Sequence, residues 1–231
     1  MSRDRDGRGV AVVAGAAGDV GRKVVETLEQ SDWTCVGLDS RSPSCEHSVT
    51  LDLWNAEMVK GEIDGLVDQF GDIECVVTTL GDDDERIGIG DITHESWRRM
   101  LRNHLEGTEH VVRSALPGMM KRRRGDIIMV TSDAAVGGPG LGAHHAAAAG
   151  AVLGFTKALG IEFAKYGIQA NCVAGARLGE GRSSLGDGEP VNVEGSGLDP
   201  IADVVAIVRY LADETHFFAG QVLSPNGGRV I

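Results

Sequence analysis

Short apolar runs alternate along the chain with longer stretches in which apolar residues recur at helical spacing. Runs typical of strands lie at residues 10–14, 35–38, 49–51, 73–79, 126–131, 168–173 and 220–223. Helical patterns lie at residues 20–28, 58–70, 96–121, 144–166 and 199–211. Strands that alternate with helices predict βαβ units and a parallel sheet covered on both faces. Because such crossovers are right-handed, the pattern favours a single doubly wound, Rossmann-type α/β domain of about seven strands.

Two segments depart from this pattern. Residues 1–8 are mostly charged and predict a flexible tail. Residues 177–199 are rich in glycine and follow the carboxyl end of a predicted strand, which is where doubly wound folds bind ligands. A loop this long is typical of a substrate lid, and a disordered insertion has a similar composition. The 231 residues otherwise fit one domain.

Composition narrows the choice of partners. The net charge of −12 disfavours nucleic acid and anionic membranes, and we find no apolar run long enough to span a bilayer. The one basic run, at residues 121–124, ends a predicted helix, where the helix dipole favours cations. We therefore expect a small-molecule substrate and neither nucleic acid nor a membrane as partner.

The cysteines and the start of the chain indicate a cytoplasmic protein. The four cysteines lack the paired spacing of metal ligands, and three of them lie in strand-like contexts, where cysteine is usually a small buried hydrophobe. The charged start lacks the apolar stretch of a signal peptide. A reducing compartment and no metal site are the simplest expectation.

A glycine-rich turn between the first strand and the first helix predicts a nucleotide site. Gly15, Gly18, Val20 and Gly21 lie in this turn, where backbone amides and the helix N-terminus favour a pyrophosphate. Asp19 complicates the prediction, because its carboxylate would lie near that anion unless it points away.

Acidic residues at the ends of the next two strands extend the predicted site. Asp39 is placed to accept hydrogen bonds from the adenosine ribose, which favours NAD over NADP, although Arg41 lies close by. Asp52, followed by Leu53, is placed to meet the adenine ring. Either aspartate could instead be a turn residue or a helix cap.

The second half of the chain carries the most specific resemblance. Residues 151–164, 166–173 and 220–228 resemble the long active-site helix, the strand after it and the C-terminal segment of the short-chain dehydrogenases/reductases. The resemblance covers nearly the whole chain and implies hydride transfer between a nicotinamide and a carbonyl or alcohol. In that family a Ser positions the substrate oxygen, a Tyr exchanges its proton, a Lys one turn later lowers the pKa of the Tyr, and an Asn supports a water relay.

The expected catalytic residues are only partly present. Ser132 matches the family serine, but His145 stands at the tyrosine position and Ala149 at the lysine position. His104 stands at the position of the asparagine, before Leu105-Glu106-Gly107.

Further departures lie on the nicotinamide side. The family's Asn-Asn-Ala-Gly reads Thr78-Thr79-Leu80-Gly81, which keeps Gly81 as a candidate cofactor contact. The Pro-Gly after the sixth strand reads Gly175-Ala176, and Glu180 stands near the position of a carboxamide-binding threonine. The resemblance therefore implies a kept adenosine half and an altered catalytic half.

The histidines leave three functions open. A histidine titrates near neutral pH without a cationic neighbour, so His145 can act as general acid or base without the missing Lys. The first hypothesis is an NAD-dependent oxidoreductase that uses Ser132 and His145. The second is a non-redox isomerase, dehydratase or cyclase in which His145 and His104 divide the acid and base roles. The third is an inactive subunit or ligand sensor. A zinc site would need a third ligand, and none has suggestive spacing.

The long helices at residues 96–121 and 144–166 have stretches rich in Ala and Gly. In the family that this chain resembles, such helices pair across subunits. The resemblance therefore implies a homodimer or homotetramer.

Overall fold

Seven parallel strands form a single sheet in a computed structural model that describes residues 8–81, 87–138, 142–175, 199–213, 216 and 218–226. The strands are β1 (Val10–Ala14), β2 (Thr34–Asp39), β3 (His47–Thr50), β4 (Ile73–Thr78), β5 (Gly125–Ser132), β6 (Ile168–Gly175) and β7 (Val222–Leu223). Their order across the sheet is β3-β2-β1-β4-β5-β6-β7. The predicted doubly wound α/β fold is therefore confirmed.

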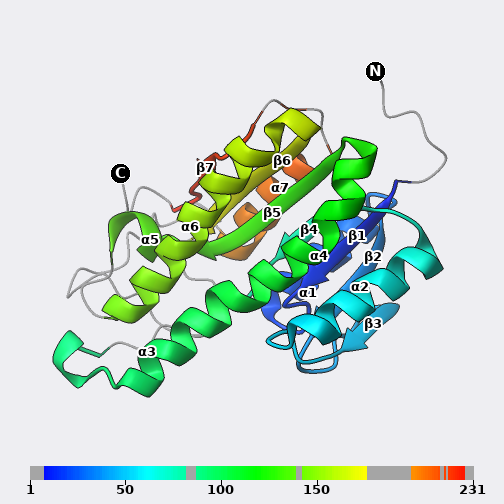
Figure 1. The fold of residues 1–231 in the computed structure, drawn as a ribbon. Helices are drawn as coiled ribbons and strands as arrows, with labels where there is room; N and C mark the ends of the chain where they lie inside the picture. The colour runs from blue at the N-terminus through cyan, green and yellow to red at the C-terminus, as the bar shows by residue number, and fades with distance from the viewer. Residues whose placement is uncertain are drawn as a thin grey trace.

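Helices cover both faces of the sheet (Figure 1). The α-helices are α1 (Asp19–Glu29), α2 (Ala56–Phe70), α3 (His94–Leu101), α4 (Gly107–Arg122), α5 (Ala134–Gly137), α6 (Ala143–Phe163) and α7 (Pro200–Asp213). Helices α2, α4 and α6 pack on one face, and α1 and α7 pack on the other. Short turns of helix lie at η1 (Ile89–Asp91), η2 (Arg102–Glu106) and η3 (Ala164–Tyr166).

Strand β1 shows why both faces need covering. All five of its residues are buried, and successive side chains point to opposite faces. Val10, Val12 and Ala14 enter the core under α2, α4 and α6, whereas Ala11 and Val13 enter the core under α1 and α7. A continuous apolar run of this kind is typical of a central parallel strand.

The strand order places the candidate site. From β1 the chain moves to one side of the sheet through β2 and β3, and β4 then returns to the other side of β1. Ligands of doubly wound folds bind where the order reverses, outside the carboxyl ends of the strands. The glycine turn after β1 and residues 79–81 after β4 both lie at that point.

The helix predicted at residues 96–121 differs from the observed structure. Helices α3 and α4 are joined by η2, a single π-helical turn. Such turns are rare and often mark functional sites. Periodicity could not reveal it, because the apolar spacing continues through the turn.

Helix α6 also departs from the sequence expectation. Together with η3 it is long and apolar enough, by length and composition alone, to cross a membrane; no other helix among the described residues passes this test. In this fold α6 packs against β5 and β6. The core helix of a sheet protein passes the same test, so the finding does not identify a membrane span.

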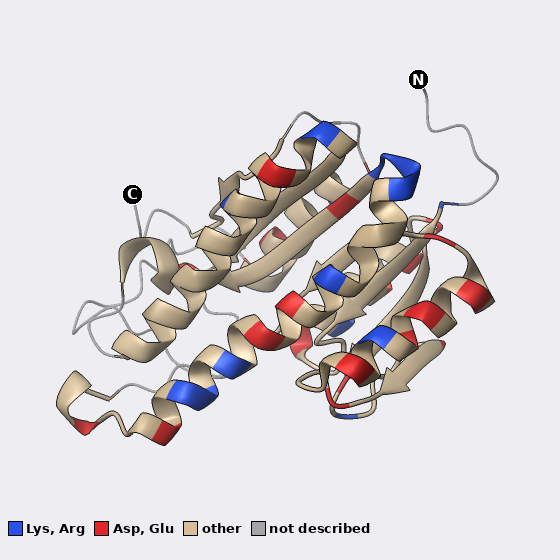
Figure 2. Ribbon diagram, viewed as in Figure 1, with Lys and Arg blue, Asp and Glu red and all other residues tan. Residues whose placement is uncertain are grey.

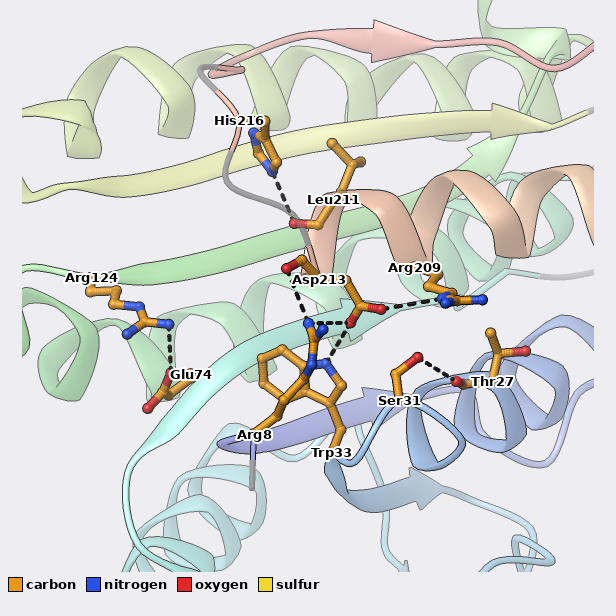
Figure 3. Close-up of polar contacts among 10 residues, drawn as sticks. All are labelled: Arg8, Thr27, Ser31, Trp33, Glu74, Arg124, Arg209, Leu211, Asp213 and His216. Carbon is orange, nitrogen blue, oxygen red and sulfur yellow. Dashed lines mark hydrogen bonds and ion pairs between the residues drawn. The ribbon is translucent and has the colours of Figure 1, made fainter. Parts of the chain in front are cut away.

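A buried carboxylate ties the start of the chain to the end of α7 (Figure 3). Asp213 accepts a hydrogen bond of 2.9 Å from the indole Nε1 of Trp33. Arg8 and Arg209 lie 2.8 and 3.2 Å from its two oxygens. Arg8, at the end of the predicted tail, is therefore anchored, and residues 1–7 lie outside the described part.

Asp199, at the end of the predicted lid, caps α7 by accepting hydrogen bonds from the amides of residues 201 and 202. The rest of the predicted lid, residues 177–198, lies outside the described part of the chain.

Candidate active site

The glycine turn after β1 is held tightly against the first turn of α1. Gly15 has a φ of 87°, in the region that favours glycine. A Cβ on Gly21 would lie 2.1 Å from the carbonyl oxygen of Gly15, so a larger residue cannot occupy this position. The amide of Gly18 donates to the same oxygen at 3.1 Å, and Val20 is buried behind the turn. The structure therefore brings the four predicted pyrophosphate-binding residues together.

Thr79 fixes this turn from the end of β4. Its amide donates to the carbonyl oxygen of Ala14 at 2.8 Å, and its hydroxyl lies 3.2 Å from the carbonyl oxygens of both Ala14 and Gly15. Thr79, at a position where the resemblance implies an asparagine, thus links the turn to β4. We did not predict this role, and only the spacing from the family motif pointed to the position.

Asp39 ends β2 beside the same turn. Its side chain is buried, with one oxygen accepting from the amide of Ala17 and the other from the amide of Arg41, each at 3.0 Å. The Arg41 guanidinium lies 3.8 Å from the carboxylate and is mostly exposed. Asp39 therefore joins the end of β2 to the glycine turn, at the place predicted for the ribose.

Asp52 and Leu53 follow β3. The carboxylate of Asp52 accepts from the amide of Trp54 at 2.9 Å, which is the turn role that the sequence left open. The carbonyl oxygen of Leu53 accepts a 3.0 Å bond from Nδ1–H of His110 on α4, since a carbonyl can only accept. His110 thus holds the segment predicted to meet adenine. It was missed because no local pattern links it to residue 53.

Two histidines meet at the carboxyl edge of the sheet. The rings of His104 and His145 are in edge-to-face contact, with centroids 5.2 Å apart, and both side chains are buried. The His104 ring lies so close to Gly81 that a Cβ there would be 2.7 Å from its Cε1. Burial, and to a smaller extent the neighbouring His145, lower the pKa of His104 to about 4. His104 is therefore neutral at pH 7.

The π-helical turn positions His104. The hydroxyl of Thr108 donates to the carbonyl oxygen of His104 at 2.9 Å and lies 3.5 Å from the hydroxyl of Thr78. All three side chains are buried. Thr78, at the other position where the resemblance implies an asparagine, is thereby connected to the turn that carries His104. The i to i+4 spacing of His104 and Thr108 was the available sequence signal.

Ser132 ends β5, the strand beside β4. Its hydroxyl accepts from the amide of Ala134 at 3.2 Å, in the short helix α5 that the hydrophobic pattern did not predict. The neighbouring Asp133 amide donates to the carbonyl oxygen of Gly175, so the ends of β5 and β6 are joined. Ser132 thus lies at the same edge of the sheet as Gly81. Ala176 and Glu180 are outside the described residues.

Ala149 closes the place where the resemblance implies a lysine. Its side chain is fully buried in α6, one turn after His145. No amino group is therefore available at this position to lower the pKa of a neighbour or to hold a ribose. A proton donor at residue 145 must act without that cation.

A family model described as short chain dehydrogenase matches residues 9–178. Since the match covers well over half of the chain, the protein belongs to the short-chain dehydrogenase family. Proteins of this family bind NAD or NADP.

The proteins that are similar to this chain are named for different substrates. The chain is 26% identical to the 3-oxoacyl-(acyl-carrier-protein) reductase of Vibrio cholerae, over 95% of this chain and 96% of that protein. It is 28% identical to the L-fucose dehydrogenase of Oryctolagus cuniculus, over 95% and 84%. The ligand-free aldohexose dehydrogenase of Thermoplasma acidophilum has the same fold, with a TM-score of 0.83 at 22% identity, over 96% and 94%.

The residues present fit one half of a dinucleotide better than the other. The glycine turn, the first-turn amides of α1 and Asp39 suit an adenosine and a pyrophosphate. On the nicotinamide side the buried Ala149 offers no hydrogen bond, and the His104 ring occupies the space over Gly81.

Proposed function

We propose that this protein is an NAD-dependent oxidoreductase of small carbonyl or alcohol substrates, with His145 in place of the catalytic tyrosine. The observation that carries the proposal is the buried contact between His145 and the neutral His104 at the carboxyl edge of the sheet. A buried imidazole at the edge of the sheet where doubly wound folds bind ligands is a suitable general acid or base.

In this proposal Ser132, His145 and His104 have different roles. When bound, the cofactor would supply the hydride as NADH during reduction of the substrate and accept it as NAD⁺ during oxidation. The Ser132 hydroxyl orients the substrate oxygen, and the His145 ring gives that oxygen a proton during reduction or takes one during oxidation. His104 packs against His145 and restricts its ring, and its own neutrality avoids a second positive charge beside the proton donor.

Asp39 supports NAD as the cofactor. A carboxylate at the end of β2 accepts hydrogen bonds from ribose hydroxyls and repels a 2′-phosphate. The exposed guanidinium of Arg41 lies 3.8 Å from the Asp39 carboxylate and would attract a 2′-phosphate, which favours NADP. Titration with NADH and NADPH, followed by nicotinamide fluorescence, measures the balance; equal or tighter binding of NADPH would contradict the assignment.

Hydride transfer tests the proposal directly. NADH oxidation is followed with a panel of aldehydes, ketones, sugars and 3-oxoacyl thioesters. We expect turnover in the wild type and a loss of about 100-fold or more in His145→Ala. His94→Ala removes an exposed histidine from α3 and is the matched control. Binding of NADH without transfer to any carbonyl of the panel would argue against the proposal.

A non-redox reaction is the second candidate, because paired imidazoles without a lysine suit proton transfer. Substrate turnover without added nucleotide, and loss of that turnover in both His145→Ala and His104→Ala, would favour an isomerase, dehydratase or cyclase. Tight NADH binding with no turnover of any kind would favour a non-catalytic subunit or sensor.

We also propose a homo-oligomer formed through α6. Figure 2 shows that charged residues are sparse along α6 and frequent on α3 and α4. The α6 surface carries Gly150, Gly154 and Ile161 at helical spacing; space next to both glycines is open, and Ile161 is 83% exposed.

A cytoplasmic location is proposed on the four cysteines, which form no disulfide in the described part of the chain.

A further inference from the structure

The first residue of α1 brings a negative charge to the predicted pyrophosphate site. Asp19 begins the helix, and about half of its side chain is exposed. The Cα–Cβ bonds of a helix tilt toward its N-terminus, so we expect this carboxylate to lie near the amides of the first turn. Gly18, which precedes it, provides no side-chain cap.

The glycine turn has few other donors to offer. The amides of residues 15 and 16 donate to the carbonyl oxygen of Leu38 at 2.8 and 3.3 Å, and that of residue 18 donates to Gly15. The amide of residue 17 donates to Asp39. A phosphate must therefore bind mainly to the first-turn amides of α1, which have no partners within the helix. Asp19 stands at this group of donors.

Arg22 neutralises the charge of Asp19 only in part. Arg22 Nη2 lies 3.8 Å from Asp19 Oδ1, while Arg22 Nη1 lies 2.9 Å from Glu26 Oε1. The guanidinium is thus shared between two carboxylates and half exposed to solvent. The Asp19 carboxylate already interacts favourably with the positive end of the α1 helix dipole. It therefore repels a phosphate that approaches the same N-terminus.

We infer that Asp19 is an affinity-determining residue that weakens pyrophosphate binding in the proposed nucleotide site. This inference rests on the proposed function for the site. Because Asp19 weakens the pyrophosphate contacts, the adenosine contributes a larger share of the free energy of dinucleotide binding. Asp19 stabilises α1 through the helix dipole. Removing its charge therefore has two effects of opposite sign, a slightly lower melting temperature and tighter binding of phosphorylated ligands.

Calorimetric titration with ADP and with adenosine separates the two halves. We expect Asp19→Asn to bind ADP about five- to tenfold more tightly than the wild type at low salt. The difference should shrink in high salt because exposed charges are screened. Adenosine, which has no phosphate, should bind both proteins equally. Glu29→Gln, at the other end of α1, removes the same charge and should change ADP affinity less than about twofold.

The outcomes distinguish this inference from the function on which it rests. Measurable ADP binding of equal strength to the wild type and Asp19→Asn overturns the role of Asp19 and leaves the nucleotide site standing. Equal gains for ADP and adenosine also overturn it, because the effect would then not act on the phosphates. If neither ADP, adenosine nor NADH binds any variant, the inference and the proposed dinucleotide site both fail.

Discussion

The rings of His104 and His145 meet edge to face with their centroids 5.2 Å apart, although one lies in the π-helical turn before α4 and the other at the start of α6. Both rings are buried, and His104 also lies against Gly81. Two of the positions at which the chain differs from the pattern that the resemblance implies are thus in contact. A change at either histidine should alter the surroundings of the other.

His104 should make the protein acid-sensitive. Folded His104 binds its proton only below about pH 4, whereas an unperturbed histidine does so below 6.5. Protonation therefore favours the unfolded chain between these values, and stability falls as the pH is lowered through this window. The full loss is about 3 kcal/mol.

Urea denaturation between pH 4 and 7 measures this effect. His104→Gln should lose less stability on acidification than the wild type, whereas the exposed His94→Gln should behave as the wild type does. Identical pH dependence in all three proteins would contradict the buried, neutral state of His104.

Gly81→Ala should disturb the histidine pair. The added Cβ would lie 2.7 Å from His104 Cε1, so the ring must move, and overpacking of this kind costs about 1–3 kcal/mol. In a His104→Ala background the same change should cost less than about 1 kcal/mol. Gly65→Ala in α2, where a Cβ meets open space, is the control and should be stabilising. Equal costs of Gly81→Ala in both backgrounds would disprove the steric coupling.

The Trp33–Asp213 hydrogen bond should contribute to stability more than the ion pairs around it. Asp213→Ala leaves the buried indole N–H without its acceptor and should cost about 3 kcal/mol. Trp33→Phe removes the donor and should cost about 1–3 kcal/mol. Arg209→Gln, at an exposed arginine, should cost less than about 1 kcal/mol. Chemical denaturation gives the ranking, and a larger effect of Arg209→Gln would reverse the interpretation.

The α6 surface should carry the proposed subunit contact. Ile161→Lys replaces an exposed apolar side chain of α6 with a charged one and should shift the protein toward monomers in analytical ultracentrifugation. Ile89→Lys changes an exposed isoleucine in η1 and should leave the assembly unchanged. A monomeric wild type, or the same assembly in both variants, would argue against an interface through α6.

Much of the fold could be predicted from the sequence. Strand β1 was predicted with the observed bounds, and β4 within one residue, because a buried parallel strand requires a continuous apolar run that the sequence displays. The glycine turn was also predictable, because the close approach of Gly21 to Gly15 excludes a side chain. Helix α5 and the π-helical turn could not be predicted from the sequence, because neither changes the spacing of apolar residues.

The sequence by itself determined the order of elements, the glycine turn after β1 and the presence of His145 and Ala149 where the resemblance implies a tyrosine and a lysine, because these are local patterns or positions counted from them. Only the tertiary structure decided that His104 contacts His145, that Thr108 binds the π-helical turn and that Asp39 is engaged by the glycine turn. The physical reason is that these contacts join segments far apart in the chain, or depend on a local helical geometry that residue spacing does not encode. Burial, which sets the low pKa of His104, likewise arises only when those segments pack.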